Sequence, residues 1–192
     1  MHSLLRGVIA GTALALCTSF ASAAVLSFDD IVGPNGYDAV PAGYGGLDWS
    51  GSNWSVITTP ETPFTAHSGD GRIVMGWDGT DATSTIRFLA PTVFDGAWFA
   101  GYAEATVRFD LYLAGALVGS SETLGLSDAP AFLASGWTGA VDAVVVSSNL
   151  HAFYVMDDFS FQDASEVPEP ATLALVLAGL GLAGAARRRR RG

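Results

Sequence analysis

The sequence predicts an all-β fold, a jelly-roll-like β-sandwich, flanked by an N-terminal signal peptide and a C-terminal transmembrane helix. The clearest strand covers residues 106–113, where Val107, Phe109 and Leu111 alternate with polar residues and thus face one side. Short apolar runs of this kind recur along the chain, separated by turns rich in Gly, Pro, Asp and Ser. No amphipathic stretch of helical length interrupts them, which favours two packed sheets over an α/β arrangement.

Residues 1–23 have the three parts of a signal peptide. Arg6 supplies a positive start, residues 8–16 form an apolar run, and Ala21-Ser22-Ala23 provides small residues at a cleavage site. We expect export through the Sec translocon and cleavage by signal peptidase between Ala23 and Ala24. Because the only cysteine, Cys17, is removed with this segment, disulfides cannot stabilise the mature protein.

The domain is expected to span residues 24–163, followed by a short polar linker at 164–167. Residues 114–116 should turn the 106–113 strand into the next strand and make a hairpin. The remaining strands are expected at residues 25–28, 54–58, 72–75, 84–89, 97–102, 117–124, 141–147, 151–155 and 159–161.

The charge of this domain is strongly negative. Three arginines, no lysine and 17 of the chain's 19 acidic residues fall between Ala24 and Asp163, a net charge near −14. Nucleic acids and anionic lipids bind basic patches, so neither is an expected partner. Divalent cations are compatible with such a surface.

Two acidic pairs suggest a structural calcium site. Asp29 and Asp30 follow the first strand, and Asp157 and Asp158 precede the last one. If the terminal strands lie side by side, these carboxylates meet at one edge, and Ca²⁺ takes roughly six to eight oxygen ligands in forgiving geometry. The alternative is that the acids are solvated turn residues that accept hydrogen bonds from nearby backbone N–H groups.

Several tryptophans offer a candidate sugar-binding site. Trp49, Trp54, Asn53 and Asp48 could combine aromatic platforms with amide and carboxylate groups that bind hydroxyls. The alternative is that Trp49 and Trp54 fill the ends of the sandwich core, the commonest use of large aromatics. Trp98 and Trp137 are expected in the core.

Catalysis is not expected. The mature chain has two histidines, His67 and His151, and no G-x-S-x-G elbow, phosphate loop or Cys/His zinc spacing. Paired carboxylates would support glycan hydrolysis only if they flanked a cleft at the right separation.

The C-terminal segment, residues 168–192, has three parts in a fixed order. Pro168, Glu169 and Pro170 form a stiff, extended entry. Residues 171–186 carry no charge and would form a helix of about 24 Å, slightly short of a ~30 Å hydrocarbon core. A block of arginines then acts as a stop signal on the cytoplasmic side: Arg187, Arg188, Arg189, Arg190 and Arg191.

This order of parts resembles the PEP-CTERM sorting signal of Gram-negative bacteria. The resemblance implies that an exosortase recognises the Pro-Glu-Pro tripeptide and releases or transfers the protein. The segments LSFDD (26–30), VPAGYGGLDW (40–49) and FYVMDDFSF (153–161) resemble extracellular β-sandwich domains found ahead of such tails. In outline they are also similar to galactose-binding-like and carbohydrate-binding-module jelly rolls.

These features predict an exported, exosortase-processed structural protein of the cell surface or of an exopolysaccharide matrix. The precursor would be tethered transiently to the inner membrane with its domain in the periplasm, and the product would be at the surface or outside the cell. The alternative is a carbohydrate-binding module of the galactose-binding-like type that contacts extracellular polysaccharide. A glycan hydrolase is a third, less favoured hypothesis.

Overall fold

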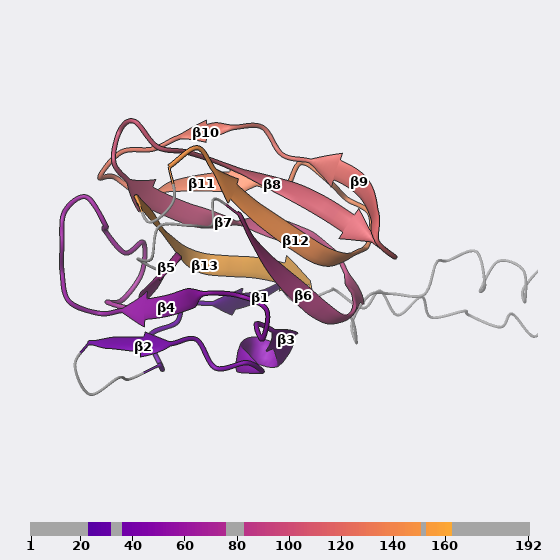
Figure 1. Cartoon of the computed structure of the whole chain (residues 1–192), viewed down its shortest axis with the longest axis horizontal. Helices are drawn as coiled ribbons and strands as arrows, with labels where there is room; N and C mark the ends of the chain where they lie inside the picture. The colour runs from indigo at the N-terminus through magenta and orange to yellow at the C-terminus, as the bar shows by residue number, and fades with distance from the viewer. Residues whose placement is uncertain (1–22, 32–35, 76–82, 151–152, 163–192) are drawn as a thin grey trace, which may run out of the picture. The chain divides into compact units, whose positions relative to one another are not determined.

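The computed structural model describes residues 23–31, 36–75, 83–150 and 153–162, all within one compact unit, Ala21–Val167. These residues form two antiparallel sheets (Figure 1). The first sheet runs in the order β11 (Ala131–Ala134), β7 (Phe94–Gly101), β13 (Tyr154–Gln162), β5 (Arg72–Met75), β4 (Trp54–Ile57) and β2 (Tyr37–Ala39), with β1 (Ala23–Leu26) also paired to β13. The second runs β10 (Leu124–Gly125), β8 (Thr106–Leu113), β12 (Val141–Ser148), β6 (Thr83–Thr92) and β3 (Leu47–Asp48), with β9 (Ala116–Ser120) also paired to β8.

The chain winds between the two sheets as a jelly roll does. From β5 to β8 each successive strand belongs to the other sheet, and the same alternation holds from β10 to β13. One apolar core built from the inward side chains of both sheets lies between them. The predicted all-β, jelly-roll-like sandwich is confirmed.

Buried and more exposed side chains alternate along β8, as the sequence predicts. Val107, Phe109 and Leu111 are buried, whereas Arg108 is exposed and Tyr112 is half-buried on the opposite face. A period of two places successive side chains on opposite faces of a sheet. The outer face of the second sheet therefore carries the polar positions of its strands.

Other boundaries differ from the sequence prediction. The strand expected at 117–124 is divided into β9 and β10, and β2, β3 and β11 were not predicted. The last two expected strands are one strand, β13, whose register shifts between Asp157 and Ser160. Asp158 has a φ of 46°, so the acidic pair makes a bulge inside the strand instead of a turn before it.

The terminal strands lie side by side, as expected (Figure 1). Ala24 of β1 is opposite Phe161 of β13, and Leu26 is opposite Phe159. The residues after Leu26 are therefore held near the bulge in β13, which positions the first acidic pair.

A loop at residues 58–71 covers part of the outer face of the first sheet. Phe64 packs in a second apolar cluster with Ile57, Val74, Ala100 and Val155. Beneath the loop lies Arg72, which is only 2% exposed. Its guanidinium donates to the carbonyl oxygens of Phe64 (2.7 Å), Thr59 (2.6 Å), Asp70 (3.0 Å) and Ile57 (3.1 Å).

The signal peptide before Ala23, the linker, Pro168-Glu169-Pro170, the expected helix at 171–186 and the arginine block lie outside the described residues. Within the described ranges no helix has the length and apolar character that crossing a membrane would need.

Candidate functional site

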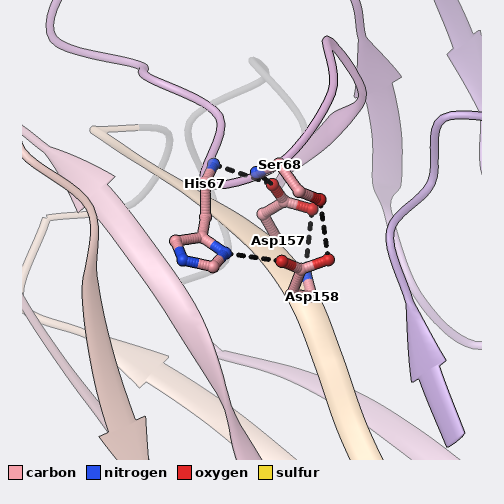
Figure 2. A network of polar contacts seen from close by, with 4 residues as sticks. All are labelled: His67, Ser68, Asp157 and Asp158. Carbon is pink, nitrogen blue, oxygen red and sulfur yellow. Dashed lines mark hydrogen bonds and ion pairs between the residues drawn. The ribbon is translucent and has the colours of Figure 1, made fainter.

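One residue of the first acidic pair and both residues of the second contact the same segment, His67–Gly71, which we call the 67–71 loop. Asp157, on the outer face of β13, accepts hydrogen bonds at Oδ2 from the backbone N–H groups of His67 (2.8 Å) and Ser68 (2.9 Å) (Figure 2). Its Oδ1 accepts from the N–H of Asp158 at 2.7 Å. This carboxylate is 2% exposed and satisfies three backbone donors.

Asp158 binds the side chains of the same two loop residues. Its Oδ2 lies 2.5 Å from Nδ1 of His67, and its Oδ1 accepts from the Ser68 hydroxyl at 2.9 Å (Figure 2). The bulge makes this possible because it turns two successive carboxylates toward one loop.

Asp29 holds the other end of the 67–71 loop. Its Oδ1 accepts from the N–H groups of Asp70 (2.9 Å) and Gly71 (2.7 Å). Gly69 lies against this carboxylate with a φ of +48°, and a Cβ there would come within 2.2 Å of Oδ1. Asp30 instead accepts from the Tyr44 hydroxyl at 2.6 Å.

These contacts agree only in part with the hydrogen-bonding alternative for the acidic pairs, because Asp157 is buried inside β13 and accepts from loop residues that are distant in sequence. Three of the four carboxylates bind the 67–71 loop and Asp30 binds Tyr44, so the carboxylates are engaged by backbone N–H groups, hydroxyls and an imidazole. Among the described residues no group of three or more His, Cys, Asp or Glu side chains is placed to hold a metal ion. Calcium at Asp29, Asp30, Asp157 and Asp158 stays a prediction.

The electrostatics of Asp157 are unusual. Burial raises the pKa of its carboxyl to about 6, with a further increase from the charge of Asp158, against the lowering effect of the backbone donors. Burial also lowers the pKa of Arg72, although the charges of Glu61, Asp157 and Asp70 oppose this shift.

Ser68, His67 and Asp158 include the residue types of a serine-protease triad, but their hydrogen bonds do not connect them as one. In a triad the serine hydroxyl bonds to the histidine, and the histidine bonds to the aspartate. Here both the Ser68 hydroxyl and the His67 ring bond to Asp158 (Figure 2). The serine therefore has no base in this arrangement, and the prediction that the chain is not an enzyme stays a prediction.

The His67 ring also stacks on Trp98, with ring centroids 3.5 Å apart and planes 11° apart. Trp98 is opposite Phe132 of β11 and Asp157 of β13 on the outer face of the first sheet. The expectation that Trp98 and Trp137 lie in the core is wrong. Trp98 is half-buried beneath the loop histidine, and Trp137 is 37% exposed.

Trp49 and Trp54 are both 2% exposed and belong to the core. The Trp49 indole donates to the carbonyl oxygen of Tyr44 at 2.8 Å, and Trp54 packs edge-on against Tyr154. Asn53 is exposed, and Asp48 accepts from the backbone and hydroxyl of Ser50. The sugar platform of Trp49, Trp54, Asn53 and Asp48 is therefore wrong, because neither indole face is accessible.

A groove on the outer face of the second sheet was not predicted. It has a volume of about 350 Å³ and is lined by Thr85, Arg87, Tyr112, Gly115, Asp142, Ala143 and Val145. These residues come from β6, β12, β8 and the turn after β8. The alternation in β8 placed Tyr112 outward, but the strand order that brings Arg87 near it is a property of the fold.

The C-terminal residues 166–191 match the family of the PEP-CTERM protein-sorting motif. The chain carries a PEP-CTERM sorting motif. The predicted resemblance of the tail is thus confirmed, and the motif identifies an exported protein with a C-terminal sorting signal. No curated protein matches the sequence.

Several solved structures are similar to the domain at low identity. A variant of the carbohydrate-binding module CBM29-2 is 15% identical, covering 78% of this chain and 99% of that chain, with a TM-score of 0.42. The CBM22-1 xylan-binding domain from Paenibacillus barcinonensis Xyn10C is 13% identical, covering 76% and 96%, with a TM-score of 0.42. TmCBM61 in complex with β-1,4-galactotriose is 14% identical, covering 61% and 87%, with a TM-score of 0.36. Similarity at these identities concerns the fold alone.

Proposed function

We propose that this chain is an exported protein whose tail is processed by an exosortase, leaving the sandwich as a structural component of the cell surface or of an exopolysaccharide matrix. The observation that carries the proposal is the match of residues 166–191 to the PEP-CTERM protein-sorting motif. The signal-peptide pattern before Ala24 supports export of the segment ahead of that tail.

Each part of the tail has a physical role in this proposal. The uncharged run at 171–186 enters the inner membrane as a helix with its backbone hydrogen bonds satisfied internally. The arginines after it stay on the cytoplasmic side and keep the sandwich on the other side. The tripeptide Pro168-Glu169-Pro170 is then exposed as an extended substrate between the domain and the membrane.

A structural role fits the domain. The 67–71 loop is held from β13 and from the turn after β1, and Arg72 binds three carbonyl groups of the loop at 58–71 and that of Ile57 in β4. A net charge near −14 between Ala24 and Asp163 favours a well-hydrated surface. These features suit a domain that persists outside the cell without disulfides.

Intact mass spectrometry of the protein recovered from its native host tests the processing step. We expect the wild-type mass to lack the tail and a variant with Pro168, Glu169 and Pro170 changed to alanine to retain it. The matched control, Asp163→Ala with Ser165→Ala, changes the last residue of the domain and one linker residue outside the motif, and it is expected to be processed normally. Retention of the tail in the wild type would overturn the proposal and make the segment a permanent anchor.

Carbohydrate binding is the second candidate function, and the groove between Arg87 and Tyr112 favours it. A phenol ring, a guanidinium and a carboxylate around a small hollow are the kinds of groups that contact a sugar ring and its hydroxyls. On this proposal the mature domain would hold extracellular polysaccharide directly.

A further inference from the structure

The groove lies over the central strand of the second sheet. Arg87 of β6 is opposite Ala143 of β12, and Ala143 is opposite Tyr112 of β8, so the three side chains form one row on the outer face. Figure 1 shows β12 between β6 and β8. Arg87 and Tyr112 are two strand spacings, about 10 Å, apart across a residue whose side chain is one methyl group. The small residue at position 143 therefore creates the hollow.

The polar groups that face this hollow are available to a ligand. Arg87 is exposed, and within the described ranges its guanidinium makes no hydrogen bond or salt bridge. The Tyr112 hydroxyl likewise has no hydrogen bond there, and Asp142 uses only Oδ2, which accepts from the N–H of Ala114 at 2.7 Å. Free donors and acceptors on a rigid sheet are what a hydroxyl-rich ligand needs.

The other two arginines of the domain are already engaged. Arg72 is buried beneath the 58–71 loop, and Arg108 forms a salt bridge with Asp110 at 3.0 Å. Arg87 thus differs from both, since it is exposed and lines a cavity of about 350 Å³. That volume falls in the range of roughly 300–1,000 Å³ typical of small-ligand sites.

The negative charge around the groove favours neutral over anionic sugars. Asp142 lines the groove, Asp48 is opposite Arg87 in the adjacent strand β3, and the whole domain is strongly acidic. A polysaccharide rich in uronate or sulfate groups would be repelled by this field. A neutral pyranose has an apolar face for the Tyr112 ring and hydroxyls for Arg87 and Asp142.

We infer that this groove is a binding site for neutral polysaccharide. Tyr112 packs against one sugar ring, Arg87 and Asp142 bind its hydroxyls, and the small side chain of Ala143 makes room for the ring. This inference rests on the second candidate function above and is independent of how the tail is processed.

The test is affinity electrophoresis of the full chain, purified in mild detergent, through gels containing a neutral galactan, xylan or glucan, or the anionic polygalacturonate. We expect at least one neutral polymer to retard the wild type and polygalacturonate to have no effect. Arg87→Gln, Tyr112→Ala and Ala143→Leu should each weaken retardation about tenfold or more, which corresponds to about 1.4 kcal/mol.

Two control variants match these changes outside the groove. Arg108→Gln removes one positive charge from the same face, and Tyr37→Ala removes an exposed tyrosine from β2 of the other sheet. Both are expected to bind as the wild type does, and equal melting temperatures show that the groove variants are folded.

Three outcomes would overturn the inference. They are no retardation by any neutral polymer, stronger retardation by polygalacturonate, or equal binding by the wild type and the folded Ala143→Leu variant. None of them bears on the mass of the processed protein, so the sorting proposal is tested separately.

Discussion

Among single residues, Asp157 shows how a buried carboxylate can organise a loop. It accepts hydrogen bonds from three backbone N–H groups while only 2% exposed. Hydrogen bonds to the ionised form lower a carboxyl pKa and burial raises it, and here burial prevails and the pKa is about 6. The residue is therefore both an anchor for the 67–71 loop and a group that titrates near neutral pH.

The pKa of Asp157 predicts a pH dependence of stability. The folded chain holds this proton more tightly, at a pKa of about 6 against the ordinary value of 3.8, so protonation favours folding. Its contribution is complete below the unfolded pKa and is lost as pH rises through about 6. We expect the free energy of unfolding to gain about 1 kcal/mol from this group between pH 7 and pH 5.

Urea denaturation of the wild type and of Asp157→Asn at both pH values measures this effect. The asparagine variant should be less stable at pH 7 by about 1–3 kcal/mol, because it loses an acceptor for a buried N–H group. It should also lose the gain at pH 5. A variant with the same pH dependence as the wild type would assign the titration to another group.

At the scale of elements, the hairpin between β8 and β9 is built on a demanding turn. Ala114 and Gly115 both have positive φ values, 51° and 78°, which is the backbone of a two-residue type I′ turn. Alanine is poorly suited to the first position, whereas asparagine tolerates it.

We predict that Ala114→Asn raises the free energy of unfolding by about 0.5–1 kcal/mol, because asparagine adopts the left-handed conformation more readily. Thermal unfolding followed by circular dichroism measures the change. The control Ala116→Asn, one residue beyond the turn and inside β9, should not stabilise the chain. A lower melting temperature for Ala114→Asn would show that the turn has other constraints.

The loop at 58–71 depends on one buried side chain, the guanidinium of Arg72. Replacing Arg72 by methionine keeps much of the side-chain length but removes the donors to four carbonyl groups. We expect a loss of about 2–4 kcal/mol and faster proteolysis within residues 58–71. Arg72→Lys should fall between, since an ammonium group cannot reproduce the planar fork. Unchanged proteolysis in Arg72→Met would contradict this role.

For the whole molecule, the strongly negative net charge makes Ca²⁺ the first cofactor to test. If a calcium ion binds at the two acidic pairs, about 5 mM CaCl₂ should raise the melting temperature, since extracellular calcium modules have dissociation constants of roughly 10⁻⁴–10⁻³ M. MgCl₂ at the same concentration controls for screening. Asp30→Asn should abolish the calcium-specific part and Asp95→Asn should not. Equal shifts in the two salts would rule out a specific site.

The sequence determined the features that depend on local periodicity and on order along the chain. Alternation in residues 106–113 predicted the faces of β8, the turn at 114–116 was predicted from its composition, and the tail was recognised from its three consecutive parts. These properties are readable because they depend on neighbours within a few residues. The pairing of the first and last strands was also expected.

Only the tertiary structure decided which residues meet. Trp49 and Trp54 are buried, whereas Trp98 lies on the outer face and not in the core. Asp29 and Asp157 bind opposite ends of one loop. The groove needs β6, β12 and β8 to be neighbours in that order, although β8 lies between the other two in the chain. Strand order is set by how the two sheets close over a common core, and this long-range packing leaves no periodic signal in the sequence.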